Sequence, residues 1–179
     1  MSFPWVANAF VPWLNPRKRA LLAVAVLTLA GCGGGGSKTA ERTVEGTGYR
    51  FSAPVDWRVV RSGREVRAGR GLSLLAVTRY ALLRSYRPAL WDHVVPELDR
   101  AASGVAEQQN GKVGASSTVT ISGRRSRRYD IDYTREGKQL VERLAFVLRG
   151  KTEYLLLCRY EAGGDTGPCD RLLATFTLG

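Results

Sequence analysis

Two aspartates in this sequence have types and spacing that suit chemistry. Asp130 and Asp132 alternate with Tyr129, Ile131 and Tyr133, a pattern typical of a strand with both carboxylates on one face, about 7 Å apart. Such a pair can bind a cation or act in general acid–base catalysis. Arginines lie just upstream, so cross-strand salt bridges are the favoured interpretation.

The single histidine is a second candidate for chemistry. His93 follows Asp92 in a segment with helical spacing, and an imidazole there can act as a general base. The chain offers no second histidine and no serine in a nucleophile-elbow setting. We therefore expect no catalytic residue, no metal site and no cofactor, and the chain is not predicted to be an enzyme.

The densest positive segment is "GRRSRR", whose arginines are Arg124, Arg125, Arg127 and Arg128. Arginine clusters bind anionic polymers and lipid surfaces, but this segment can equally form a solvated turn between strands. The formal net charge of the whole chain is +11. Either anionic partners or the arginine-rich usage of a GC-rich genome accounts for that charge, and the sequence favours neither.

Cys158 and Cys169 are expected to form a disulfide, because an even pair of cysteines in an exported domain is typical of one. The segment between them, "RYEAGGDTGP", contains glycines that let the chain fold back. Metal binding would need more ligands than these two thiols and His93, and a redox pair is more often closely spaced.

The third cysteine, Cys32, ends a segment with the layout of an export signal. Three basic residues precede an apolar run from Ala20 to Ala30, which at about 17 Å is too short to span a bilayer. Leu29-Ala30-Gly31-Cys32 resembles the bacterial lipobox, in which the cysteine is lipidated. The alternative is an ordinary cleaved signal that leaves Cys32 as a free thiol.

This signal divides the chain into three parts. Residues 1–31 are the predicted lipoprotein signal peptide, residues 32–43 a flexible Gly/Ser tether behind the lipidated cysteine, and residues 44–179 a single domain. Because residues 1–31 hold three basic residues and no acidic one, the remaining chain carries +8. The predicted location is the extracytoplasmic face of the cell membrane, which excludes nucleic acid as a partner.

Alternating apolar residues predict an antiparallel meander of strands. The predicted strands are 48–54, 57–61, a short strand near 64–69, 72–83, 118–123, 127–134, 139–150 and 152–161. Hairpin-like connections are expected at "REGK" and "GKT".

Two segments with helical spacing can cover this sheet. Residues 88–109 repeat apolar side chains at Leu90, Val94, Leu98, Ala101 and Val105. Residues 168–176 do the same at Cys169, Leu172, Leu173 and Phe176. The strand 154–161 is apolar on both faces, so each face needs a cover. The predicted fold class is α+β, with the sheet covered by one long helix and a short C-terminal helix.

The opening "YRFSAPVDWRV", the long helix between early and late strands, and a final helix ending "LLATF" together resemble the PsbP-like fold, also called the Mog-type α/β/α sandwich. Small DcrB-like and actinobacterial lipoproteins share this fold. The resemblance implies the fold for residues 44–177 and carries over no functional residue; Trp57 in its "FSAPVDW" signature is interpreted as core.

These observations favour a non-enzymatic binding or accessory module, anchored to the membrane through Cys32. Its expected partner is an anionic envelope polymer, a lipid or a protein. The alternative is a carrier of a lipid or another apolar ligand, which would require a cavity of several hundred cubic ångströms.

Overall fold

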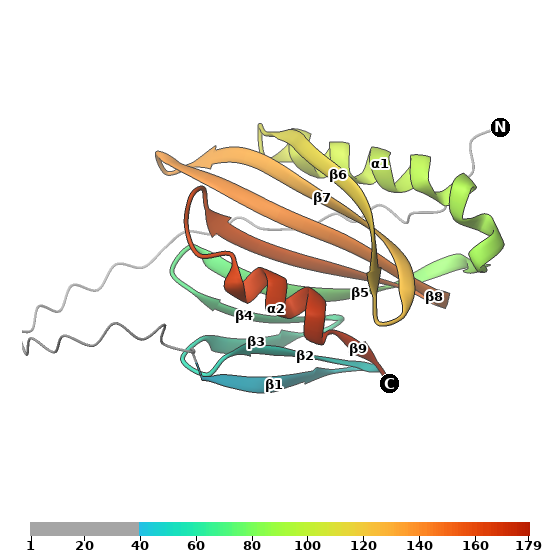
Figure 1. Cartoon of the computed structure of the whole chain (residues 1–179), viewed down its shortest axis with the longest axis horizontal. Helices are drawn as coiled ribbons and strands as arrows, with labels where there is room; N and C mark the ends of the chain where they lie inside the picture. The colour runs from blue at the N-terminus through green and yellow to red at the C-terminus, as the bar shows by residue number, and fades with distance from the viewer. Residues whose placement is uncertain (1–39) are drawn as a thin grey trace, which may run out of the picture.

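The chain folds into two antiparallel sheets and two α-helices (Figure 1). The structure is a computed structural model that describes residues 40–179. Its elements, in chain order, are β1 (Glu41–Gly46), β2 (Tyr49–Pro54), β3 (Arg58–Ser62), β4 (Glu65–Arg70), β5 (Ser73–Tyr86), a 3-10 turn η1 (Pro88–Leu90), α1 (Trp91–Gln108), β6 (Lys112–Ile121), β7 (Arg124–Arg135), β8 (Lys138–Glu161), α2 (Gly167–Thr175) and β9 (Thr177–Leu178).

The larger sheet has six strands in the order β3-β4-β5-β8-β7-β6, and the smaller has three in the order β1-β2-β9. Strands β3 to β5 and strands β6 to β8 each form a run of hairpins between sequence neighbours. The pairing of β5 with β8 joins the two runs into one sheet. This arrangement confirms the predicted α+β class.

Each face of the six-stranded sheet buries its own core. Helix α1 covers one face and contacts β6 and β7, whereas α2 and the three-stranded sheet lie on the other face (Figure 1). Leu156 and Tyr160 of β8 point into the core beneath α2, and Leu155 and Leu157 point toward the core beneath α1. The predicted apolar character of both faces, and their two covers, are confirmed.

Strand β8 corrects the predicted turn at "GKT". Residues 138–161 form one continuous strand instead of two strands joined by a hairpin. Its first part pairs with β7, up to Phe146 opposite Arg127. Its second part pairs with β5, from Gly150 opposite Tyr86 and, beyond a bulge in β5, from Thr152 opposite Ala81. Gly150 takes a positive φ of 54° where β5 bulges, so the glycine bends the strand without reversing it.

The folded part begins earlier than expected. Strand β1 starts at Glu41, opposite Pro54 of β2, so residues 41–43 belong to the small sheet and not to the predicted tether. Trp57 is buried in the core on the α2 side, in agreement with its interpretation as a core residue.

The buried side of α1 is rotated slightly from the predicted one. Val94 and Leu98 are buried as expected, but the helix then buries Ala102 and Ala106 in steps of four. Trp91, at the start of the helix, is also buried. Among residues 40–179, no helix is long and apolar enough to cross a membrane.

Candidate functional site

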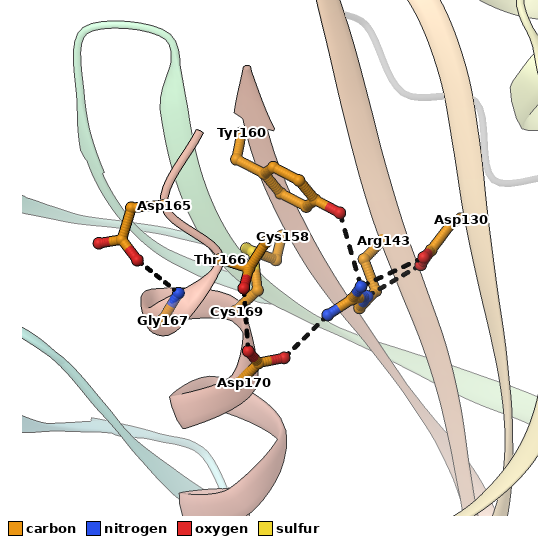
Figure 2. A network of polar contacts seen from close by, with 9 residues as sticks. All are labelled: Asp130, Arg143, Cys158, Tyr160, Asp165, Thr166, Gly167, Cys169 and Asp170. Carbon is orange, nitrogen blue, oxygen red and sulfur yellow. Dashed lines mark hydrogen bonds and ion pairs between the residues drawn. A yellow bond between two sulfur atoms is a disulfide. The ribbon is translucent and has the colours of Figure 1, made fainter. Parts of the chain in front are cut away.

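Asp130, the first aspartate of the predicted pair, is bound by an arginine on the neighbouring strand (Figure 2). Arg143 of β8 lies directly opposite Asp130 in the register. Its guanidinium donates to both carboxylate oxygens, from Nε at 2.8 Å and from an Nη at 3.2 Å. The salt bridge was predicted across strands, but its partner is Arg143 and not the arginines upstream of Asp130.

Arg143 also holds the start of α2. Its second Nη donates to Asp170 at 2.9 Å, and the Tyr160 hydroxyl lies 3.5 Å from the guanidinium (Figure 2). The hydrogen bonds with Asp130 are the main cause of a raised pKa for Arg143. One guanidinium therefore joins β7, β8 and α2.

The predicted disulfide lies beside this network. Cys158 of β8 and Cys169 of α2 are bonded, with their Cα atoms 5.4 Å apart, and both are buried (Figure 2). Helix α2 is thus fastened to the sheet by a covalent bond and by the Arg143–Asp170 ion pair. We interpret this region as a structural clamp, because each of its charged groups is already bonded within the protein.

The other candidates for chemistry are Asp132 and His93, which lie on different elements, β7 and α1. Asp132 lies opposite Lys112, next to the irregular pairing around Gly114 of β6. His93 is exposed on α1. Within residues 40–179, no group of three or more histidine, cysteine or carboxylate side chains is placed to hold a metal ion.

The four arginines of the predicted basic patch lie in β7, where successive side chains point to opposite faces of the sheet. Arg125 and Arg127 lie on the α1 side: the Arg125 guanidinium is 4.9 Å from the centre of the Trp91 ring, and Arg127 pairs with Asp99 at 3.3 Å. Arg124 and Arg128 occupy the alternate positions on the opposite face. The structure does not bring the four together, and their binding to anionic surfaces stays a prediction.

Cys32 lies outside the described residues. Its lipidation, the signal peptide and the membrane location therefore stay predictions.

A cationic cleft that the sequence did not reveal lies between the two sheets. It has a volume of about 430 Å³ and is lined by residues of the β1–β2 turn, β2, the β3–β4 turn, β4, β5 and β8. These residues are Thr47, Tyr49, Gly63, Arg64, Val66, Arg79, Ala81, Lys151 and Thr152. Three cations and no acidic residue are among them. Arg79 lies on the face of β5 that bears Leu75 and Val77, whereas Lys151 shares the face of Glu153 and Leu155, and the Arg64 guanidinium lies 4.5 Å from the centre of the Tyr80 ring in the core beneath α1.

The cleft has a buried apolar floor and an exposed charged rim. Tyr49 and Val66 are buried, whereas the side chains of Arg79 and Lys151 are exposed. Burial raises the pKa of Tyr49 to about 12, so the phenol is neutral and donates a hydrogen bond of 3.1 Å to the carbonyl of Val77.

The sequence carries one local signal for this cleft. On β5 the same face bears Leu75, Val77, Arg79 and Ala81, so an arginine continues a row of core residues. The change from apolar residues to an arginine indicates where the elements that cover this face of the sheet end. Arg64 and Lys151 lie on distant segments, and no spacing rule connects them to Arg79.

A separate, very small void lies within the core beneath α1. Its volume is about 10 Å³, roughly the space of one water molecule. Leu82, Val94, Leu98 and Leu148 are among its lining residues, together with the carboxyl group of Glu153. Burial raises the pKa of Glu153 to about 7.

No protein-family model and no curated protein matches this sequence. Several solved structures are similar to it. Cyanobacterial PsbP (CyanoP) from Synechocystis sp. PCC 6803 aligns over 84% of this chain and 99% of its own, with 17% identity and a TM-score of 0.53. A protein of Bacteroides thetaiotaomicron VPI-5482 aligns over 74% of this chain, with 15% identity and a TM-score of 0.54.

The chain spans less than half of that Bacteroides protein, 45% of its length. LpqN of Mycobacterium tuberculosis, involved in cell envelope biogenesis, aligns over 78% of this chain with 14% identity and a TM-score of 0.45, which supports no assignment. Sequence identities this low support a statement about the fold alone. The sheet order, the two helical covers and the alignment with CyanoP over nearly its whole length together identify an α+β protein with the PsbP-like fold.

Proposed function

We propose that this chain is a lipid-anchored binding module at the outer face of the cytoplasmic membrane, and that it binds an anionic ligand in the cationic cleft without chemical conversion. The observation that carries this proposal is the cleft itself, an opening of about 430 Å³ with Arg64, Arg79 and Lys151 around it.

Anchoring is proposed from the sequence. Leu29-Ala30-Gly31-Cys32 follows an apolar run and a basic cluster, and two or more acyl chains on Cys32 would anchor the protein stably. Eight residues separate Cys32 from Glu41, the first residue of β1. The cleft would therefore work close to the membrane surface.

A binding module fits the cavities better than a carrier of apolar ligands does. A carrier needs an enclosed apolar space of several hundred cubic ångströms. The void in the core beneath α1 measures about 10 Å³, and the larger opening is lined by cations and hydroxyl groups together with the apolar Val66 and Ala81. The size and chemistry of the cleft favour a polar, negatively charged ligand.

Photo-crosslinking in the intact envelope tests this proposal. Ala81 is exposed in the cleft, and Ala81→p-benzoylphenylalanine would place a photoreactive group there. We expect light-dependent adducts that disappear when Arg79→Gln and Lys151→Gln are added. The matched control carries the same photoreactive residue at exposed His93 on α1. Adducts that survive the two substitutions, or that form equally from position 93, would overturn the cleft as the binding site.

A further inference from the structure

We infer that the outer edge of β6 is a docking surface for an extended segment of another protein, which adds to the six-stranded sheet as a further strand and carries acidic side chains toward Arg124 and Arg128. This edge is separate from the cationic cleft, because no residue of β6 lines that cleft. Binding at one surface therefore does not depend on binding at the other.

Strand β6 has a neighbouring strand on one side only. The order of the six-stranded sheet ends at β6, which pairs with β7 alone among residues 40–179 (Figure 1). Within that part of the chain, no backbone group of residues 112–121 forms a hydrogen bond outside the β6–β7 hairpin. One row of backbone N–H and C=O groups is therefore open, and such a row is the template for strand addition.

The hairpin turn identifies the groups in this row. Ser122 and Gly123 both have positive φ, 51° and 68°, as in a type I′ turn. The pair that flanks such a turn, Ile121 and Arg124, exchanges backbone hydrogen bonds, and bonded pairs then alternate along the ladder. The exposed residues whose N–H and C=O consequently point away from β7 are Ser116, Thr118 and Thr120.

Residues 115–121 lack the features with which proteins usually protect an edge strand. Their sequence, "ASSTVTI", contains no charged residue, no proline and no glycine. The other edge strands are different: β3 carries Arg58 and Arg61, β1 carries Glu41 and Glu45, and β9 has only two residues. Within residues 40–179, β6 is therefore the long edge that a further strand can approach most readily.

The charges beside this edge select the partner. Arg128 of β7 lies opposite Ser117, on the face of the sheet that α2 covers, and Arg124 shares that face. Among residues 40–179, neither arginine side chain forms an ion pair or a hydrogen bond. Because Ser117 is small, the Arg128 side chain can extend across β6 toward an added strand, which would lie about 10 Å from β7.

The opposite face shows that an arginine of β7 can reach β6 in this way. One Nη of Arg127 donates to the Ser116 hydroxyl at 3.0 Å. A glutamate or aspartate on the added strand would meet Arg128 above Ser117, and opposite charges on neighbouring strands stabilise their pairing. The unpaired arginines therefore favour an acidic segment as the partner.

Charge argues against a second copy of this chain at the same edge. The formal net charge of the whole chain is +11. Antiparallel pairing of two β6 edges would bring Arg124 and Arg128 of both copies toward one interface, where like charges repel. An acidic segment instead neutralises these arginines.

Titration with fluorescent peptides tests the partner's chemistry on the full chain in detergent. The probes are three short peptides in which threonine alternates with glutamate, with glutamine or with lysine. By fluorescence anisotropy we expect the glutamate peptide to bind at least about fivefold more tightly than the glutamine peptide, and the lysine peptide not to bind measurably. Equal affinity for the glutamate and glutamine peptides would overturn the choice of an acidic partner.

Backbone methylation of the glutamate peptide separates strand addition from simple charge attraction. Residues of the added strand that donate to β6 lie opposite Ser116, Thr118 and Thr120 and share their face, so they are the threonines of the peptide, whereas its glutamates lie on the face of Arg128. N-methylation of the threonines should weaken binding at least about tenfold, because several ladder bonds are lost. N-methylation of the glutamates should leave the affinity nearly unchanged. Equal affinities of the two methylated peptides would overturn strand addition.

Matched variants test the edge itself. Arg124→Gln with Arg128→Gln should reduce the affinity for the glutamate peptide to within about twofold of that for the glutamine peptide. The control, Arg58→Gln with Arg61→Gln, removes the same charge from exposed positions on the β3 edge and should bind normally. Equal losses in both double variants would overturn β6 as the docking edge. Circular dichroism verifies that each variant is folded.

Thr118→Pro distinguishes the acidic segment from a second copy of this chain. The substitution removes an N–H that points away from β7, so it should weaken the glutamate peptide while the hairpin stays paired. Analytical ultracentrifugation of the full chain in detergent should show no dimer that depends on Thr118. A dimer that Thr118→Pro dissociates would overturn the acidic segment in favour of a second copy.

Discussion

Replacing Glu153 with glutamine should stabilise the protein at neutral pH and leave it unchanged in mild acid. Glu153 is only 4% exposed on β8, in the core beneath α1. Burial is the cause that raises the pKa of its carboxyl group from 4.5 to about 7. The folded protein therefore carries a carboxyl group that its environment keeps protonated to unusually high pH.

The sign and size of the effect follow from proton linkage. Because the pKa is higher in the folded state than in the unfolded chain, the folded state binds the proton more tightly, and its stability falls as pH rises from 4.5 toward 7. Each pKa unit corresponds to about 1.4 kcal/mol. The ionised carboxylate thus costs about 3 kcal/mol above pH 7, and nothing below pH 4.5.

Urea unfolding of the full chain at pH 4.5, 6 and 8 measures this directly. Glu153→Gln should raise the free energy of unfolding at pH 8 by up to about 3 kcal/mol, by a smaller amount at pH 6, and not at pH 4.5. Glu142, whose pKa is also raised by burial, is present in both proteins, so its contribution cancels. Glu45→Gln, at an exposed position on β1, is the control.

The reasoning is refuted if the stability difference between Glu153→Gln and the original protein is the same at pH 4.5 and pH 8. It is also refuted if the substitution destabilises the protein at pH 8. Either result would mean that the carboxylate has bonded partners in the folded state that offset its burial.

Three further predictions concern the clamp around α2 and the anchor. Cys158→Ser with Cys169→Ser should lower the free energy of unfolding by about 3 kcal/mol, since the bond closes a loop between residues 11 apart; urea unfolding with a loss under about 1 kcal/mol would contradict this. Arg143→Gln should lower the free energy of unfolding by about 2 kcal/mol or more, because it breaks two ion pairs of a guanidinium whose side chain is only 12% exposed. The control Lys138→Gln, which breaks an exposed ion pair, should lower it by less than about 1 kcal/mol. Equal losses of stability in the two variants would argue against the clamp. Cys32→Ala should release the protein from the membrane fraction and block lipid-type processing, and normal processing with membrane retention would exclude lipidation.

Local patterns were sufficient to predict most elements of this fold. Alternation predicted the strands around the cores, and helical spacing predicted α1 and α2 with Val94, Leu98 and Leu172 on their buried sides. After Leu98 the predicted stripe continued at Ala101 and Val105, which are only partly buried against the core, because steps of three and four are equally compatible with a helix until its packing is known. The structure continues in steps of four, to Ala102 and Ala106.

These local patterns could not predict the pairing between strands that are distant in sequence. Gly150-Lys151-Thr152 has the composition of a tight turn, and a hairpin there would satisfy every local rule. The actual strand continues because β7 offers partners up to Phe146, and β5 offers partners from Gly150 onward. The topology of the sheet determines which strands pair, and a short stretch of sequence carries no information about it.

The same reason explains why the sequence did not reveal the cleft. The sequence places four arginines close together in β7, but alternation sends them to opposite faces of the sheet. The residues that line the cleft are remote in sequence, and their segments come together only because β5 pairs with β8 and with the β3–β4 hairpin.

Hydrogen–deuterium exchange with inorganic phosphate as an anionic probe tests the central claim, that the cationic cleft is the ligand site, most directly. The account predicts that the ligand slows exchange in the four segments around the cleft, residues 46–49, 61–66, 77–82 and 150–153, and not elsewhere in residues 40–179. Protection confined to residues 123–128 would contradict it, and would move the anion site to the arginines of β7.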